Sequence, residues 1–358
     1  ESLEDAGVDP LELRGGNVGV FVGAMWADYG RLTSDDPANI DQHTGTGADL
    51  SIISGRISYT LGLEGTSMTI NTASSSSLVA MHVACQSLRT GETTMALAGG
   101  VNLIITPHAT IMMSKVGTQN PAGQCRAFDA SANGYVRAEG GGLVVLKPLS
   151  RAIADGDRIY CLIRGSAANN DGFSNGLTAP NPKAQESVVR AALANARVDP
   201  GSIHYVETHG PGTILGDPLE ASALGAVIGV NRPADRPLRI GSIKTNIGHL
   251  EAAAGVAGFI KTALALHHRM LPGNLHFERP NPHIPFEALH IKVQAALEPW
   301  PTNDEVPRAG VSSFGFSGSN VHMVLEAAPK SEALMLPLAS VSAAGLRRQV
   351  LASLDFAF

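Results

Sequence analysis

The sequence predicts a layered α/β fold. Short runs of apolar and β-branched residues alternate along the chain with longer small-residue runs at helical spacing, which is the pattern of layered sheets and helices. Its 358 residues suffice for one large domain or two fused units with a generous buried core. Hydrophobic residues make up 44% and charged residues 16%, which favours an interior-rich enzyme over a disordered or coiled-coil chain.

The pattern of apolar residues predicts the strands and helices along the chain. We expect strands at residues 18–22, 67–70, 95–98, 143–146, 159–164, 204–207, 239–243 and 321–325. Residues 76–88 carry an apolar stripe and are followed by Gly91, a C-terminal stop, which predicts a buried helix. Residues 250–268 are small and apolar on nearly all sides, so that helix is expected between layers.

Three further helix starts are expected. The chain opens in a helix at residues 2–6 with no strand before it, so we expect the first unit to be cut at its N-terminus. Asn181 and Asp217 each precede a proline and are predicted to cap helices. Glu220, three residues after Asp217, would complete a capping box.

Composition excludes several functional classes. The net charge is −6 with both signs interspersed, so no basic stripe is available for nucleic acid. No apolar run approaches the roughly 18 residues of a membrane span and no signal peptide is visible, so we expect a cytoplasmic protein without membrane contact. Cys85, Cys125 and Cys161 have no metal-ligand spacing and are expected to be small buried hydrophobes in a reducing compartment.

Residues 71–78, Asn-Thr-Ala-Ser-Ser-Ser-Ser-Leu, pass from a predicted strand into the 76–88 helix within a few residues. A side chain in so sharp a turn faces open space, and the helix N-terminus beside it favours an anion by about 0.3–1 kcal/mol. Serines also cap many helices, although four in a row exceed what a cap needs. Taken alone, the segment still fits a structural cap better than a nucleophile elbow.

Two histidines each follow a predicted strand and precede a predicted helix. His209 lies in Val-Glu-Thr-His-Gly-Pro-Gly-Thr (206–213), and His249 ends Gly-Ser-Ile-Lys-Thr-Asn-Ile-Gly-His (241–249). A histidine in such a loop can transfer a proton or form hydrogen bonds. A single loop histidine is more often a surface residue, but two in the same arrangement favour a functional site. Residues 310–322 form a glycine-interrupted turn into the final strand, which suits either oxyanion donors or a tight structural turn.

Together the four segments resemble the β-ketoacyl synthase family, in the polyketide synthase branch, whose motifs TACSSS, HGTGT, KTNIGH and GFGGTNAH follow in this order. The likeness extends over roughly residues 1–326. It implies a thiolase-like fold of two related α/β halves in five layers, at residues 1–150 (truncated) and 151–326. After the second half the sequence becomes proline-punctuated, so we expect residues 327–358 to begin a linker to the next domain. It also implies three partners: acyl carrier protein, an adjacent acyltransferase domain or linker, and a second copy in a homodimer.

In that family a cysteine thiolate takes the acyl chain, and two histidines assist decarboxylation of a carrier-bound malonyl-type extender whose carbanion attacks the thioester. By position, catalytic roles fall to Ser74, His209, His249 and Lys244. The backbone N–H groups of Ser74 and Phe316 would form the oxyanion hole, with Phe316 also a gate, and Thr213 would contact the phosphopantetheine arm. The resemblance implies no metal and no directly bound cofactor, because the carrier arm brings the substrates.

The chain departs from these motifs at several positions. Ser74 replaces the cysteine, Pro211 the first threonine of HGTGT, and Asn71 an aspartate; Ser317 and Ser319 replace glycine and threonine. A thiol is drawn toward thiolate by a helix N-terminus and nearby histidines, whereas a hydroxyl needs a dedicated base. We therefore expect the condensing reaction to be impaired at acylation, with decarboxylation retained.

Several interpretations stay open. The chain is either a condensing domain whose cysteine an experimenter exchanged, or a natural serine variant that decarboxylates malonyl thioesters or only passes chains on. Pro211 and Asn71 favour natural drift, and the intact histidines and Lys244 favour a working parent. A non-catalytic dimerisation scaffold is less favoured, because it needs neither histidine. A serine hydrolase is least favoured, because we expect the Gly-x-Ser-x-Gly pentapeptide that it would need to be absent, and Ser74 lies in a different local sequence.

Overall fold

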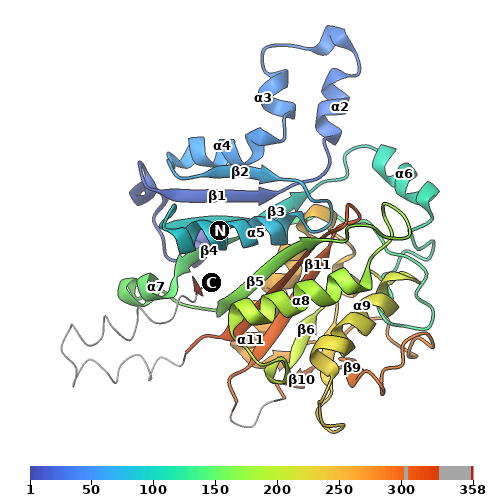
Figure 1. The fold of residues 1–358 in the computed structure, drawn as a ribbon. Helices are drawn as coiled ribbons and strands as arrows, with labels where there is room; N and C mark the ends of the chain where they lie inside the picture. The colour runs from blue at the N-terminus through green and yellow to red at the C-terminus, as the bar shows by residue number, and fades with distance from the viewer. Residues whose placement is uncertain (302–304, 330–355, 358) are drawn as a thin grey trace, which may run out of the picture.

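A computed structural model of the chain describes residues 1–301, 305–329 and 356–357. Two α/β halves stack on each other, with helices between their sheets and on the outer faces (Figure 1). The layered α/β prediction is confirmed. Of the linker predicted at 327–358, residues 330–355 and 358 lie outside the described residues.

The first half contains four strands in the order β2-β1-β3-β4. They are β1 (Val18–Gly23), β2 (Ser67–Ile70), β3 (Met95–Asn102) and β4 (Gly140–Pro148). β1 pairs parallel with β2 and β3, and β4 runs antiparallel to β3. β1 is buried along its whole length because α5 and α4 cover its two faces, which is why its sequence is continuously apolar.

The second half repeats this arrangement. Its order is β5-β12-β11-β6-β7-β9, built from β5 (Cys161–Asn170), β6 (Tyr205–Glu207), β7 (Leu238–Gly241), β9 (Ile291–Val293), β11 (Arg308–Phe314) and β12 (Ser319–Ala327). The strands from β11 to β9 are parallel, and β12 is antiparallel to both β11 and β5. The short β13 (Phe356–Ala357) pairs antiparallel with β4 and β5 and lies between the two halves.

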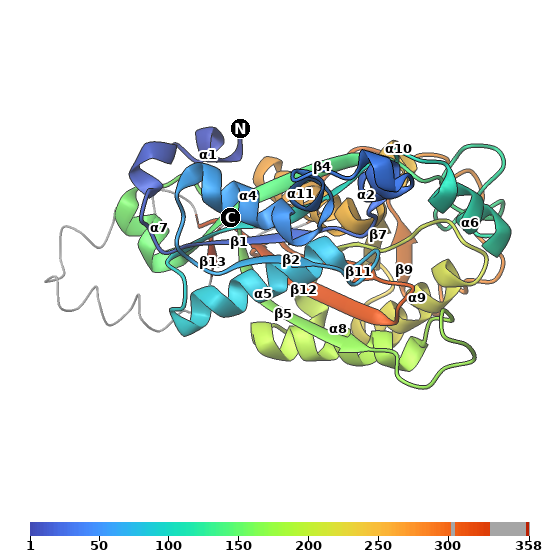
Figure 2. The same ribbon diagram turned by 90° about the horizontal axis from the view of Figure 1, so that it is seen from above.

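Helices complete five layers. α4 (Ser51–Leu61) covers the outer face of the first sheet, and α8 (Pro182–Ala196) and α9 (Gly216–Leu224) cover the second. α5 (Ser76–Thr90) and α11 (Ala254–His268) lie between the sheets and contact strands of both. Figure 2 shows α8 running beside β5 and β12. One core cluster therefore contains residues of both halves, among them Phe21, Leu78, Ile163, Phe259 and Met323.

Shorter elements surround these layers. They are α1 (Ser2–Asp5), α2 (Asp28–Ser34), α3 (Thr44–Ala48), α6 (His108–Val116), α7 (Leu149–Asp155), α10 (Lys244–Ile247), and the paired β8 (Met270–Leu271) and β10 (Glu298–Pro299). α2 and α3 project beyond the first sheet (Figure 1). In the described ranges the longest helices have 15 residues, and none is long and apolar enough to cross a membrane.

All eight predicted strands are present, and the predicted interior helices at 76–88 and 250–268 are confirmed as α5 and α11. Gly91 ends α5 in the left-handed conformation (φ 74°), as its position predicted. Asn181 caps α8 by accepting a hydrogen bond from Lys183 N–H, also as predicted. β11 was missed, because residues 310–322 were interpreted as a turn and one strand, whereas they form most of a two-stranded hairpin.

Candidate active site

A left-handed residue shapes the turn from β2 into α5. Ala73 has φ 56°, a conformation that non-glycine residues seldom adopt. It is held by Asn71 Oδ1, which accepts from Ala73 N–H at 3.1 Å, and by Ser76 Oγ, which accepts from Thr72 N–H at 2.9 Å and donates to the Ala73 carbonyl at 2.5 Å. Ser75 Oγ donates to the Thr72 carbonyl at 2.9 Å. Ser75 and Ser76, two of the four serines, therefore fix the turn, and Ser75 makes no side-chain capping bond at the start of α5.

The hairpin between β11 and β12 lies against this turn. Ser313 Oγ donates to the Ser74 carbonyl at 2.9 Å. A Cβ on Gly315 would lie 2.2 Å from the Thr72 carbonyl oxygen, so only glycine permits this approach. Ser74 is 9% exposed, and its hydroxyl makes no hydrogen bond to any described residue. Ser77 Oγ accepts from Val256 N–H in α11 at 3.0 Å, so within this run only the Ser74 hydroxyl has no bond to a described residue.

Two buried carboxylates hold the loop of His209. Glu220 accepts from the His209 and Gly210 N–H groups, each at 2.8 Å, and Asp217 accepts from Gly212 N–H at 3.0 Å and Thr213 N–H at 3.3 Å. The capping prediction for Asp217 and Glu220 was therefore wrong, since α9 begins at Gly216 without a side-chain cap. Burial raises the pKa of Asp217 to about 6 and that of Glu220 to about 7.

His249 is fixed on its main chain and on its ring. Its N–H donates to the Val136 carbonyl at 2.7 Å, and its own carbonyl accepts from Ala138 N–H at 2.9 Å. The ring packs against Tyr135 with centroids 4.9 Å apart. Nδ1 accepts from Glu251 N–H at 2.9 Å. Since Nδ1 is an acceptor, the neutral ring carries its proton on Nε2.

His209 and His249 are neighbours with the same protonation pattern. Their ring centroids are 5.3 Å apart in an edge-to-face arrangement. Phe314 N–H points at His209 Nδ1 with an N···N distance of 3.4 Å, which again leaves the proton on Nε2. Burial, reinforced by the charge of Lys244, holds the pKa of both imidazoles well below the usual range. At neutral pH both rings are therefore neutral and present Nε2–H as a donor.

Lys244 connects the two histidine loops. It begins α10, is buried, and donates from Nζ to the His209 carbonyl at 2.5 Å. Burial lowers the pKa of Lys244, and the charge of Glu207 opposes that shift most strongly. Glu207 in turn accepts from Ile243 N–H and from Lys261 Nζ, both at 2.6 Å. The lysine therefore acts here as a structural donor to the main chain of His209.

The remaining predicted site residues, Phe316 and Thr213, are not fully buried. Phe316 is 45% exposed in the turn after β11. No described residue accepts a hydrogen bond from the backbone N–H of Ser74 or Phe316. Thr213 Oγ1 accepts from Gly216 N–H at 3.1 Å, which leaves its own proton to donate. Pro211 is buried in the same loop. The structure thus brings Ser74, His209, His249 and Lys244 together through shared contacts.

No cysteine lies at the turn after β2. Cys85 is inside α5, and the thiol of Cys125 accepts a hydrogen bond from Val136 N–H at 3.2 Å. Cys161 in β5 lies opposite Ala327 of β12, at the end of β12 that is far from the hairpin turn. All three are free and buried, as predicted. Burial raises the pKa of each thiol, that of Cys85 to about 12. These thiols are therefore held in their neutral form.

A Gly-x-Ser-x-Gly pattern does occur at residues 172–176, contrary to expectation. It lies in the loop between β5 and α8, and Ser174 Oγ donates to the Gly176 carbonyl at 2.6 Å. Neighbouring Phe173 and Leu177 are almost fully exposed. This serine therefore caps a surface turn and has no elbow geometry. Within the described ranges, no three His, Cys, Asp or Glu side chains group to hold a metal ion.

Sequence reasoning missed the pairs that hold the histidines. Besides Asp217 and Glu220, these are Arg137 and Glu251, which form a buried ion pair beside His249. A visible signal existed for Glu251, the single charged residue among the small apolar residues of 250–260. A charge in such a stretch requires a buried partner.

Comparison with known proteins gives consistent matches. The β-ketoacyl synthase N-terminal domain model matches residues 1–152, the C-terminal domain model 160–278, and the ketoacyl-synthetase C-terminal extension 280–343. One of the phenolphthiocerol/phthiocerol polyketide synthase subunits of Mycobacterium tuberculosis is 55% identical over 326 residues, which cover 91% of this chain and 17% of that protein. Polyketide synthase GfsA of Streptomyces halstedii is 50% identical over 334 residues, covering 93% and 4%.

Solved ketosynthase structures are also similar to this chain. The ketosynthase from module 6 of the bacillaene synthase of Bacillus subtilis 168 superposes with a TM-score of 0.85 at 43% identity, covering 91% of this chain and 57% of that one. A cysteine-to-serine mutant of the same ketosynthase gives a TM-score of 0.86 at 43% identity, covering 92% and 56%. The chain spans less than a fifth of the curated relatives above and somewhat over half of these ketosynthase structures. The thiolase-like fold that the sequence implied is the fold of these structures.

Proposed function

Because the chain belongs to the β-ketoacyl synthase family, as a ketosynthase domain of the polyketide synthase type, we propose that it binds acyl and malonyl-type thioesters at the Ser74, His209 and His249 site. It decarboxylates the malonyl unit, and condensation is disabled at acylation because a serine stands at the nucleophile position. The phosphopantetheine arm of acyl carrier protein brings both substrates.

One observation carries this proposal: both imidazoles accept at Nδ1 from backbone N–H groups, so both offer Nε2–H. A malonyl thioester oxygen that accepts from these two donors gains negative charge as the bond to the carboxylate breaks. The electron pair of that bond becomes the enolate, and carbon dioxide leaves. Neutral donors suit this step, because the charge that develops is anionic and appears on the substrate.

The same geometry disfavours acylation. A serine hydroxyl becomes a nucleophile when an adjacent base takes its proton. Ser74 Oγ bonds to no described residue, and Nδ1 of both histidines is already an acceptor for main-chain N–H groups. A cysteine would need no base, since the helix N-terminus lowers a thiol pKa directly. The lost function is thus specific to the nucleophile.

The experiment is intact-mass measurement of the chain after incubation with a short acyl thioester, combined with an assay of carbon dioxide released from malonyl carrier protein. Release without an adduct supports the proposal. An acyl adduct on Ser74 contradicts it, and absence of both activities in a folded chain favours the scaffold interpretation.

The carrier arm should bind weakly at Pro211. A hydroxyl in the family motif is replaced by a ring, and a neutral hydrogen bond contributes about 0.5–1.5 kcal/mol. We expect Pro211→Thr to lower the apparent KM for malonyl carrier protein by roughly two- to tenfold, with kcat little changed. Malonyl-N-acetylcysteamine, a thioester that lacks most of the phosphopantetheine arm, is the control substrate, and its KM should change less. Unchanged kinetics with the carrier-bound substrate would show that this loop does not meet the arm.

We also propose a homodimer formed across β2, with an adjacent acyltransferase domain or linker as the third partner. β2 is the edge strand of its sheet, and both Ser67 and Met68 are exposed on it. An open strand edge with an exposed apolar side chain is commonly covered by another chain. Light scattering of the chain should give twice the monomer mass, and a single-chain mass at all concentrations would contradict the dimer.

The division of the chain is proposed on the same basis. The two matched family domains abut between residues 152 and 160, close to the division expected at 150/151, and β4 and β5 lie on either side of it. We place the end of the second half near residue 326, at the end of β12.

A further inference from the structure

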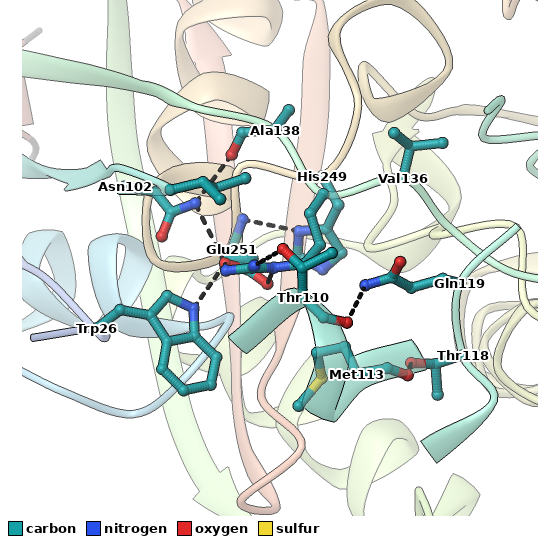
Figure 3. A network of polar contacts seen from close by, with 12 residues as sticks. Trp26, Asn102, Thr110, Met113, Thr118, Gln119, Val136, Ala138, His249 and Glu251 are labelled. Atoms are coloured by element: carbon teal, nitrogen blue, oxygen red, sulfur yellow. Dashed lines mark hydrogen bonds and ion pairs between the residues drawn. The ribbon is translucent and has the colours of Figure 1, made fainter. Parts of the chain in front are cut away.

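A buried ion pair lies directly behind His249. Arg137 Nε donates to Glu251 Oε1 at 2.6 Å, and a second guanidinium nitrogen donates to Oε2 at 2.8 Å. Both side chains are only 3% exposed. Trp26 Nε1 also donates to Glu251 Oε2, at 2.6 Å, and Asn102 Nδ2 donates to it at 3.2 Å (Figure 3). The glutamate oxygens are thus held by donors from three separate segments of the first half.

Arg137 lies in the segment that hydrogen-bonds to the main chain of His249. Val136 accepts from His249 N–H, and Ala138 donates to the His249 carbonyl. Arg137 lies between these two residues, and its backbone forms an isolated β-bridge with His249. Its side chain extends past the histidine to Glu251. Its other terminal nitrogen donates to Thr110 Oγ1 at 2.6 Å in α6. One three-residue segment therefore fixes the histidine and the glutamate together.

Glu251 in turn donates the backbone hydrogen bond that the His249 ring accepts. Its backbone adopts φ 46°, the left-handed region that a residue with a long side chain rarely occupies. This conformation directs the Glu251 N–H at His249 Nδ1, at 2.9 Å. Such strain persists only where surrounding contacts impose it. The bidentate bond to Arg137 and the bond from Trp26 are the contacts that impose it here.

We propose that Arg137 and Glu251 are positioning residues, which fix His249 in the orientation and tautomer that present Nε2–H to the substrate. The inference rests on the proposed function of this site. Neither residue touches the substrate; they act through the main chain and Nδ1 of His249. If the carboxylate is released, Glu251 relaxes from its left-handed conformation, Nδ1 loses its donor, and the imidazole gains access to its other tautomer.

The test reads the tautomer of His249 directly. The chain is labelled with 13C,15N-histidine, and the His249 resonances are identified by their loss in His249→Asn. In the unsubstituted chain we expect the Nε2–H tautomer. In Glu251→Gln, which keeps the side-chain size but breaks the ion pair, we expect the resonances to move toward a mixture of tautomers. Release of carbon dioxide from malonyl-CoA should fall at least about tenfold in kcat, with KM changed less, since a well-placed donor contributes roughly 10²–10³-fold.

Two further variants keep the test decisive. Glu251→Gln leaves Arg137 buried without its partner and can therefore unfold the chain, whereas Arg137→Leu with Glu251→Leu removes both charges and should fold. Glu326→Gln is the matched control. Glu326 in β12 pairs with Arg164 of β5 at 2.8 Å and Arg308 of β11 at 2.6 Å, within the second sheet. It should leave the His249 resonances unchanged and the rate within about twofold.

The outcomes separate this inference from the proposed function. An unsubstituted chain whose His249 carries its proton on Nδ1 overturns the positioning role without any variant. Unchanged His249 resonances in a folded Glu251→Gln or double variant also overturn it. If the unsubstituted chain releases no carbon dioxide but the tautomer still changes in the variants, the positioning role stands and the proposed function fails.

Discussion

Replacing Ser74 with cysteine is expected to produce a covalent acyl adduct on a chain that otherwise forms none. Incubation with a short acyl thioester should add the acyl mass to Ser74→Cys, with a rate constant at least on the order of 10²-fold above the unsubstituted chain. This expectation follows from the proposed function, in which only the nucleophile is deficient. The turn at Ala73, the N-terminus of α5 and two neutral imidazole donors are already in place. Intact-mass measurement over time gives the rate.

Two controls define what the adduct means. Ser317→Cys places the same thiol on an exposed serine of the hairpin turn and measures the background reactivity of a surface thiol. Ser74→Ala removes the hydroxyl and should behave like the unsubstituted chain. A stable adduct on Ser74 itself would show that the hydroxyl has a base. A folded Ser74→Cys that resists acylation would show that drift at Asn71 and Pro211 has dismantled the condensing site, and the decarboxylase or scaffold interpretations would then lead.

The sequence was most informative where local patterning decides the structure. The run from 71 to 78 predicted the turn before α5, and the two strand-end loops predicted the histidines, because each signal depends on neighbours within a few residues. Three of the four segments also lead out of the carboxyl ends of β2, β6 and β7, and the fourth contains the turn at the carboxyl end of β11, where α/β folds commonly build their sites. The motif order then assigned them to a single site.

The missed features depend on contacts between distant residues. Arg137 and Glu251 are 114 positions apart, and no local pattern joins them. Asp217 and Glu220 have the spacing of a capping box, yet their carboxylates accept from the 209–213 loop, because those N–H groups would otherwise be buried without partners. β11 was missed because Arg-Ala-Gly-Val-Ser-Ser-Phe lacks a clear alternation; it is buried on both faces between β6 and β12.

Loss of either site histidine is expected to abolish most decarboxylation. His209→Asn and His249→Asn should each lower the release of carbon dioxide from malonyl carrier protein by roughly 10²–10³-fold, the effect of removing one donor to a developing oxyanion. The double variant should lose little more than either single variant, because the two donors act on one oxygen. His82→Asn is the matched control: it removes a partly buried histidine of α5, bonded to Ser166 Oγ at 2.8 Å and with no bond to the site residues. Its rate should stay within about twofold of the unsubstituted chain.

Carbon dioxide trapped from labelled malonyl carrier protein gives the rate for each variant, and folding is checked by its thermal transition. Release that persists in the folded double variant would mean that the thioester oxygen is stabilised elsewhere, with the backbone N–H groups of Ser74 and Phe316 as the next donors to test. If the unsubstituted chain is folded and releases none, the two histidines have no decarboxylating role. In that case their arrangement, with Nδ1 held by Phe314 and Glu251 and both rings kept neutral, serves only to pack the centre of the domain, and the scaffold interpretation becomes the stronger one.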